Sequence, residues 1–289
     1  MKAPAIDYVK PSSLPEVFPL LQQFGDEARL LAGGQTLLAT LNMRLSEPTV
    51  LIDLSAIAEL RGIAVAGSML RIGAMVTHSE IEASELVAKH APLLPMAAPH
   101  IAHRAIRNLG TLGGSIAYAD PAAEWPACLL ALDGVVVAKS DTGERRIRAD
   151  DFFVDLYTTT LLPGEIIVAC EFPVAAAGHW CDFDELARRH GDYAIVGLAG
   201  AGKRAENTLT QVRLVFLGLG ATALRALQAE VVINGQALTD TLIDQAVIAL
   251  KGELSAVGDL TSDAATKMHL AGVLLKRMLM KHVTDLTAR

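Results

Sequence analysis

The sequence predicts an α+β protein in two parts, on three observations. Strand-like and helix-like segments alternate over the first 54 residues, which is typical of a βαβα unit. The run 173–178 is Pro-Val-Ala-Ala-Ala-Gly, a small-residue stretch punctuated by proline, as linkers often are. Three strand-like stretches, around 180–188, 193–202 and 209–219, then precede a mostly helical remainder.

These observations set the expected domain boundaries. We expect a first domain over residues 1–175 and a second over 176–289. The first is expected to divide into subdomains of about 1–54 and 55–175.

The opening elements can be justified in order. Ser13-Leu14-Pro15-Glu16 has the capping-box pattern and predicts a helix to about Phe24. The apolar segment 28–31 predicts a short strand that runs into a Gly-Gly turn. Residues 36–41 have helical character, and 50–54 read as a strand.

The second subdomain mixes both kinds of element. Strands are expected near 69–73, 135–138 and 165–169, and helices over roughly 79–89, 92–103 and 122–132. In the second domain the helical pattern is strongest from about Ser262 to His282.

Composition narrows the classes of function. The chain has 289 residues, 52% hydrophobic and 20% charged, with a formal net charge of −7. This balance argues for a packed core and against disorder or nucleic-acid binding. The N-terminus shows no signal-peptide region, and no window has the 18 or so apolar residues that span a bilayer. We therefore expect a cytoplasmic protein without membrane insertion.

The cysteines exclude an iron–sulfur cluster on this chain. Cys128, Cys170 and Cys181 have no CxxC spacing, and three thiolates cannot supply the usual four ligands. Any clusters that serve this protein would lie on another chain.

Two glycine-rich turns about 80 residues apart are the main candidate binding motif. They are Ala32-Gly33-Gly34-Gln35-Thr36 and Gly110-Thr111-Leu112-Gly113-Gly114-Ser115. Glycine lets a backbone amide approach a ligand closely, and amides at such turns can hold an anion. A single glycine pair is more often an ordinary turn. Two such turns, each with a hydroxyl or amide side chain, suggest two arms around one diphosphate.

Two downstream motifs imitate nucleotide-binding loops. Residues 197–203 fit a P-loop until Arg204 replaces the required Ser or Thr, and 204–208 read as a polar hairpin turn. Residues 218–223 resemble the start of a Rossmann fingerprint, but no acidic residue follows at the expected distance. We interpret this second motif as a strand-to-helix turn.

Acid–base machinery is sparse. His100 and His103 have metal-ligand spacing but no third ligand in sequence, so a helix-surface or capping role is favoured and no metal site is predicted. No nucleophile motif is present. A chain whose redox cofactor performs the chemistry would look like this.

Three motifs together resemble one family. Ala32–Leu38, Ile106–Ser115 and Ala119–Glu124 are similar to the FAD-binding signatures of the medium subunit of molybdenum hydroxylases, the carbon monoxide dehydrogenase and xanthine dehydrogenase superfamily. Ala187–Ala194 resembles the signature of that family's C-terminal domain. The resemblance spans essentially the whole chain.

The resemblance implies a fold. The first domain would be a two-subdomain FAD-binding domain of the vanillyl-alcohol-oxidase (PCMH) type. A smaller domain, with a three-stranded antiparallel sheet and a helical bundle, would follow it.

The resemblance also implies the cofactor-binding residues. The two glycine turns would hold the FAD diphosphate, Ile101 and Ile167 would line the flavin or adenine, Glu124 would help to hold the cofactor, and Tyr193 would meet the isoalloxazine ring. The full expected set is Ala32, Gly33, Gly34, Gln35, Thr36, Ile101, Gly110, Thr111, Gly113, Gly114, Ser115, Asp120, Glu124, Ile167 and Tyr193.

Some of these residues have ordinary structural alternatives. Ile101 and Ile167 also suit a core, Glu124 suits the first turn of a helix, and Tyr193 suits a strand with its hydroxyl at the surface.

Two positions depart from the family pattern. Gln35-Thr36 stands where some members have His-Ser, and Glu185 stands where some have a lysine near the cofactor. The second change puts a cationic partner for the cofactor in question.

The resemblance implies a redox subunit. Electrons would pass from two [2Fe–2S] clusters on a small subunit to FAD on this chain and then to an external acceptor. A large subunit would carry the molybdenum cofactor, and the assembly would be a dimer of heterotrimers. The alternatives are a free-standing FAD oxidoreductase that acts directly on a small substrate, and a flavin-free scaffold. The substrate and the final acceptor are left open.

Overall fold

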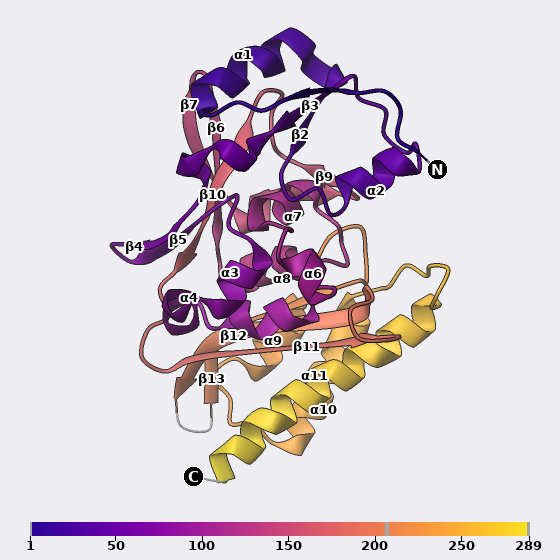
Figure 1. Ribbon diagram of the computed structural model, residues 1–289. Helices are drawn as coiled ribbons and strands as arrows, with labels where there is room; N and C mark the ends of the chain where they lie inside the picture. The colour runs from indigo at the N-terminus through magenta and orange to yellow at the C-terminus, as the bar shows by residue number, and fades with distance from the viewer. Residues whose placement is uncertain (1, 206–207, 288–289) are drawn as a thin grey trace.

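The computed structural model describes residues 2–205 and 208–287. Its three larger sheets follow one another along the chain, and Figure 1 shows the N-terminal sheet and the C-terminal helices at opposite ends of the molecule.

The N-terminal sheet is parallel and has the order β1-β3-β2. Its strands are β1 (Asp7–Val9), β2 (Ala28–Leu31) and β3 (Val50–Asp53), connected by α1 (Leu14–Phe24) and α2 (Leu37–Asn42). Short 3-10 turns cover Gly25–Glu27, Leu54–Ala56 and Ala58–Leu60. The predicted helix and the last two strands are confirmed, while β1 is too short for its three residues to show a periodicity.

The second sheet is antiparallel and has the order β4-β5-β10-β6-β7. Its strands are β4 (Ile63–Ala66), β5 (Met69–Gly73), β6 (Val135–Ser140), β7 (Gly143–Arg148) and β10 (Ile166–Pro173). Strands β8 (Phe153–Asp155) and β9 (Thr158–Thr159) form a separate two-stranded sheet after the 3-10 turn Ala149–Asp151. Strand β10 is apolar almost throughout because it is central. Val168 packs into the core that contains Val17 of α1, and Phe172 packs into the core that contains Trp125.

Short helices fill the connection between β5 and β6. They are α3 (His78–Ala83), α4 (Glu85–His90), α5 (Leu93–Ala97), α6 (Arg104–Arg107), α7 (Leu112–Tyr118) and α8 (Glu124–Ala131), with a 3-10 turn at Ala98–His100. The expected helices 79–89 and 92–103 were wrong as continuous elements. Ser84 starts a new helix by accepting a hydrogen bond from the Val87 amide. Pro99 has no N–H to continue an α-helix.

The third sheet is antiparallel, with the order β11-β12-β13-β14. Its strands are β11 (His179–Ala187), β12 (Ala194–Ala205), β13 (Thr208–Leu217) and β14 (Leu224–Arg225). The expectation of three strands was therefore one short, because a two-residue strand leaves no sequence signal. Residues Glu206 and Asn207 of the predicted hairpin turn lie outside the described residues.

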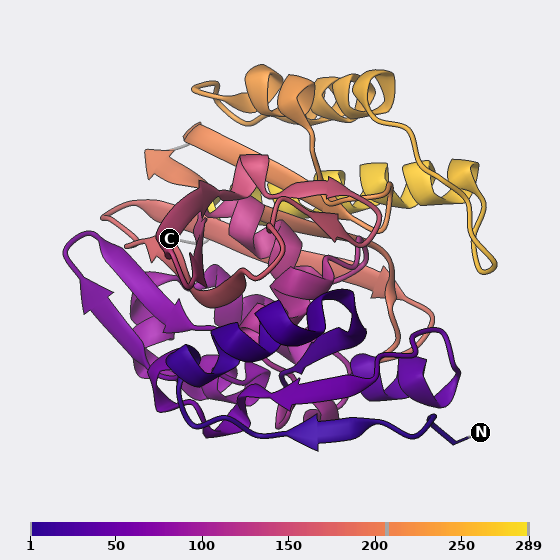
Figure 2. The same ribbon diagram turned by 90° about the horizontal axis from the view of Figure 1, so that it is seen from above.

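Helices cover both faces of this third sheet. Helices α5 and α8 pack on one face, while α9 (Leu227–Ile233) and α11 (Ala264–Thr287) pack on the other. Helix α10 (Asp240–Glu253) lies against both α9 and α11. Figure 2 shows this helical layer on the far side of the sheet from the N-terminal strands.

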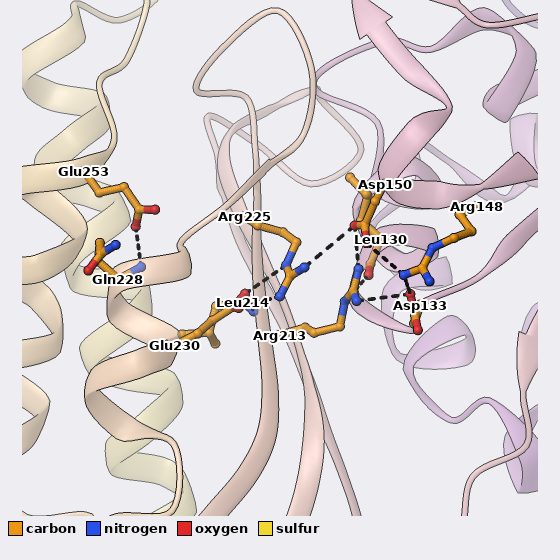
Figure 3. A network of polar contacts seen from close by, with 10 residues as sticks. All are labelled: Leu130, Asp133, Arg148, Asp150, Arg213, Leu214, Arg225, Gln228, Glu230 and Glu253. Atoms are coloured by element: carbon orange, nitrogen blue, oxygen red, sulfur yellow. Dashed lines mark hydrogen bonds and ion pairs between the residues drawn. The ribbon is translucent and has the colours of Figure 1, made fainter.

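A polar network connects the third sheet to residues 130–150 of the preceding part of the chain (Figure 3). Arg213 on β13 donates to the Leu130 carbonyl over 2.8 Å, to Asp133 over 3.1 Å and to Asp150 over 2.6 Å. Arg225 on β14 lies 3.8 Å from the same Asp150 carboxylate and pairs with Glu230 at 2.6 Å. Arg213 and Arg225 are thus held by carboxylates from two parts of the chain, Asp133 and Asp150 before the third sheet and Glu230 after it.

Within residues 2–205 and 208–287, the chain has no helix with the length and apolar character that a bilayer crossing requires.

Candidate functional site

One cavity of about 870 Å³ lies between the two glycine turns and the start of β12. It is within the size range of small-molecule and cofactor sites. All fifteen residues predicted from the sequence line it: Ala32, Gly33, Gly34, Gln35, Thr36, Ile101, Gly110, Thr111, Gly113, Gly114, Ser115, Asp120, Glu124, Ile167 and Tyr193.

The first glycine turn presents unpaired backbone amides. It directly follows β2 and runs to Thr36, which precedes α2. In the described part of the chain, the amides of residues 33–36 have no hydrogen-bond acceptor. Gly34 has φ +71°, a left-handed conformation that glycine adopts without cost. All four residues line the cavity, and a row of adjacent free amides can bind an anion.

The second glycine turn uses its amides differently from what we expected. The Leu112 and Gly113 amides donate to the carbonyls of Val76 and Ala74, over 3.0 and 2.8 Å, and the Gly114 amide donates to Thr111 Oγ1 over 3.2 Å. The expectation of a second amide cradle was wrong in this respect. The turn is paired with the 74–77 segment, with a β-bridge between Thr77 and Thr111. Its hydroxyl-bearing residues, Thr111 and Ser115, line the cavity.

The two turns pack directly against each other. A Cβ built on Gly33 would lie 2.1 Å from the Leu109 carbonyl oxygen and 2.8 Å from the Gly110 Cα. A Cβ on Gly113 would lie 2.5 Å from the Ala74 Cβ. The absent side chains therefore allow backbone to approach backbone, which fixes the spacing of the cavity's two sides.

His78 is a cavity residue that the sequence did not single out. It begins α3, after a capping box formed by Thr77 and Glu80. Trp125 Nε1 donates to its Nδ1 over 2.9 Å, so the neutral ring carries its proton on Nε2. Burial, with the nearby Arg107 guanidinium, lowers the pKa of His78 to about 4. His78 is therefore a neutral hydrogen-bond donor beside Gly110.

One end of the cavity is acidic. Burial, followed by the charges of Glu185 and Asp120, raises the pKa of Glu124 to about 8. Burial also raises the pKa of Asp120, whose carboxylate accepts a hydrogen bond from the Ala122 amide over 2.9 Å. Tyr193 stands at this end, 65% exposed. Glu124 does begin α8, as its structural alternative proposed, and it lines the cavity as well.

The apolar sides of the cavity are also part of the core. Ile101 and Ile167 are both buried and both line the cavity, so the two interpretations of each hold together. Ile101 is positioned by Arg107, which donates from Nη1 to the carbonyls of Ile101 and Ala102, each over 3.1 Å. Ile167 lies at a bulge where β10 begins to pair with β6.

Several cavity residues went unpredicted. Besides His78, they include Arg29, Tyr118, Tyr157 and Asp192. Arg29 is the one Lys or Arg that lines the cavity among the described residues, and its Nη1 donates to the carbonyls of Asp26 and Ala28 over 2.8 Å. The resemblance of 187–194 to a family signature was the available signal for Asp192.

The rejected motifs are elsewhere in the fold. Residues 197–203 lie within β12 as strand, so the P-loop is excluded. Residues 218–223 connect β13 to the short β14 rather than to a helix, which corrects the expected strand-to-helix turn. The histidine pair diverges. His100 Nδ1 lies 3.5 Å from Glu185 Oε1, while the ring centroids of His103 and His190 are 6.1 Å apart. His103 precedes α6 without a side-chain capping bond.

Comparison with known proteins gives the family. Residues 4–175 match the FAD binding domain in molybdopterin dehydrogenase, and residues 182–282 match the CO dehydrogenase flavoprotein C-terminal domain. The nicotine 6-hydroxylase medium subunit of Paenarthrobacter nicotinovorans is 40% identical over 97% of this chain and 98% of its own length.

Solved structures agree along the whole chain. A carbon monoxide dehydrogenase from Hydrogenophaga pseudoflava, which lacks the Mo-pyranopterin moiety, superposes with a TM-score of 0.93 at 37% identity and covers 96% of each chain. Quinoline 2-oxidoreductase from Pseudomonas putida 86 superposes with a TM-score of 0.93 at 35% identity and covers 99% of each chain. The chain belongs to the FAD-binding medium subunits of the molybdenum hydroxylases, the oxidoreductase family of carbon monoxide dehydrogenase and xanthine dehydrogenase.

Proposed function

We propose that this chain holds one FAD in the cavity between residues 33–36 and 110–115. In this role it receives electrons from [2Fe–2S] clusters on a small partner subunit and passes them to an external acceptor. A large subunit would carry the molybdenum cofactor, in a dimer of heterotrimers in the cytoplasm. The row of unpaired amides at residues 33–36 is the observation that most directly supports a diphosphate there.

The residues present fit FAD. The cavity combines amides and hydroxyls at the glycine turns with apolar sides at Ile101 and Ile167. Only one cationic side chain of the described residues lines it, Arg29, so amides would supply most of the attraction for the diphosphate. Such neutral donors suit a chain of net charge −7.

Each group of residues has a distinct task. FAD, when bound, would supply the chemistry that converts single-electron input into two-electron output. The amides of 33–36 bind the diphosphate, and the Thr111 and Ser115 hydroxyls bind from the opposite side. His78, as a neutral ring, would donate a hydrogen bond from Nε2 to the cofactor. Ile101 and Ile167 exclude water from the apolar part of the cofactor.

The remaining assignments follow the family. We propose domains at 1–175 and 176–289, with the first in subdomains 1–54 and 55–175 and of the vanillyl-alcohol-oxidase type. The named relatives include enzymes for nicotine and carbon monoxide. The large subunit would select the substrate of this complex.

Purification of the complex from its natural host through a tag on this chain tests the proposal. We expect iron, molybdenum and one FAD per chain to co-purify. A chain that purifies alone with a flavin reduced by substrate would instead support the free-standing oxidoreductase. A flavin-free complex would support a scaffold.

A further inference from the structure

A lysine is buried on α11, away from the cavity described above. Lys267 is 5% exposed and is not among the described residues that line the cavity. Its Nζ donates to the carbonyl of Gly218 over 2.8 Å and lies 2.7 Å from the Asp259 carboxylate. Lysine is rarely buried unless its charge is paired, and these two contacts satisfy the ammonium.

The Asp259 carboxylate balances the charge of Lys267. Asp259 lies in the loop before α11, where its Oδ1 accepts hydrogen bonds from the amides of Thr261 and Ser262 over 2.7 and 3.0 Å. The hydrogen bond from Lys267 lowers the pKa of Asp259, so the carboxylate stays ionised in neutral solution. The bond from Nζ to the Gly218 carbonyl is therefore a charge-assisted one, which is stronger than a bond between neutral groups.

Gly218 connects α11 with the turn between α7 and α8. It directly follows β13 and has φ +82°. Its amide donates to the Pro121 carbonyl over 2.8 Å, and its carbonyl accepts from Lys267. A Cβ on Gly218 would lie 2.7 Å from the carbonyl oxygen of Ile195, so a side chain would not fit at this crossing.

Pro121 belongs to the turn that forms the acidic end of the cavity. Asp120, Ala123 and Glu124 of the same segment line the cavity. The Asp120 carbonyl accepts from the Ala123 amide over 3.1 Å, which closes the turn on itself. The Gly218 amide then ties this closed turn to the third sheet.

We propose that Lys267 is a positioning residue for the cofactor site. It acts through Gly218 and Pro121, and the segment that it places is Asp120–Glu124. The two hydrogen bonds of this series are both 2.8 Å long. Loss of the ammonium removes a donor from the Gly218 carbonyl and lets the carboxyls at this end of the cavity shift. The inference rests on the proposed function, because their position affects a flavin only if FAD occupies the cavity.

A purely structural alternative is that Lys267 only anchors the loop of Asp259. Lys267→Met removes both contacts of Nζ, whereas Asp259→Asn removes the ion pair and leaves the bond to Gly218. Positioning predicts an altered flavin site in the first variant alone. Loop anchoring predicts the same result in both.

The test compares these variants in the purified complex. Lys276→Met is the matched control, because it makes the same change on the same helix but removes an exposed ion pair with Asp244. The visible circular dichroism of the bound flavin is recorded first, since a general loss of stability would not alter the spectrum of flavin that stays bound. The Kd for FAD is then measured by titration of the FAD-depleted complex.

We expect Lys267→Met to change the flavin spectrum. It should also raise the Kd for FAD about tenfold, which is the effect of displacing one hydrogen bond to the cofactor. Asp259→Asn and Lys276→Met should keep the spectrum and the Kd of the wild type.

The double variant Lys267→Met with Asp259→Asn serves if the single variant does not fold, because it leaves neither charge of the pair unmatched. It should show the same altered spectrum and Kd as Lys267→Met. A wild-type spectrum and Kd in whichever of these two variants folds would overturn the proposal. So would equal changes in Lys267→Met and Asp259→Asn. A wild-type complex without FAD would instead refute the proposed function.

Discussion

Gly33 and Gly110 touch through their backbones, so that a Cβ on Gly33 would lie 2.8 Å from the Gly110 Cα. The first turn presents free amides, and the backbone of the second turn packs against it. The distance between the two turns therefore depends on a contact between two residues that are 77 positions apart in sequence.

Gly33→Ala should separate the two turns. The new Cβ would meet the Leu109 carbonyl oxygen at 2.1 Å, and overpacking of this kind costs about 1–3 kcal/mol. We expect both the free energy of unfolding in urea and the FAD content to fall. Gly252→Ala is the control, because a Cβ there meets no atom within 4 Å and the residue is helical in α10. Equal FAD content in the two variants would contradict the packing described.

Thr36→Val should weaken FAD binding without destabilising the fold. The Thr36 hydroxyl makes no capping bond to α2 and lines the cavity. Loss of one hydrogen bond to the cofactor corresponds to about a tenfold rise in Kd. Thr36→Ser should restore the affinity measured by titration of the apoprotein with FAD. If Val and Ser variants bind alike, the hydroxyl is not a ligand.

His78 should make stability depend on pH. Its pKa is about 4 in the folded chain, against 6.5 for a free histidine side chain, so the unfolded chain binds more protons between these values. The contribution of His78 to the free energy of unfolding is therefore fully present above pH 6.5. It is lost as the pH falls toward 4, by up to about 3 kcal/mol. His78→Asn keeps an acceptor for Trp125 but does not titrate, and should flatten this part of the urea-unfolding profile.

His78→Phe provides the counterpart. It removes the acceptor and leaves the buried Trp125 N–H unpaired, which costs about 1–3 kcal/mol at any pH. Identical pH profiles for the wild type and the Asn variant would rule out His78 as the titrating group.

Arg213→Met should loosen the contact between the two halves. The guanidinium, 15% exposed, holds the Leu130 carbonyl and the carboxylates of Asp133 and Asp150. Its loss leaves these groups short of donors and should cost about 1–3 kcal/mol in thermal or urea unfolding. Lys276→Met, which removes an exposed ion pair with Asp244, should leave the midpoint unchanged. Similar effects from both variants would argue against the network as a clamp.

The sequence predicted the lining of the cavity better than it predicted the details of the fold. The glycine turns, Glu124 and Tyr193 carry local signals, and all fifteen predicted residues line one cavity. His78 was missed because its importance comes from Trp125, 47 positions away. The amides of Leu112 and Gly113 were misassigned for the same reason, since only the fold brings the carbonyls of Ala74 and Val76 to them. Strand β14 was missed because two residues show no periodicity.

A structure of the purified native complex tests the central claim most directly. We predict one FAD per chain, with its diphosphate within hydrogen-bond distance of the amides of residues 33–36 and of the Thr111 or Ser115 hydroxyl. A diphosphate elsewhere, or a cavity filled by protein from a partner subunit, would contradict this claim.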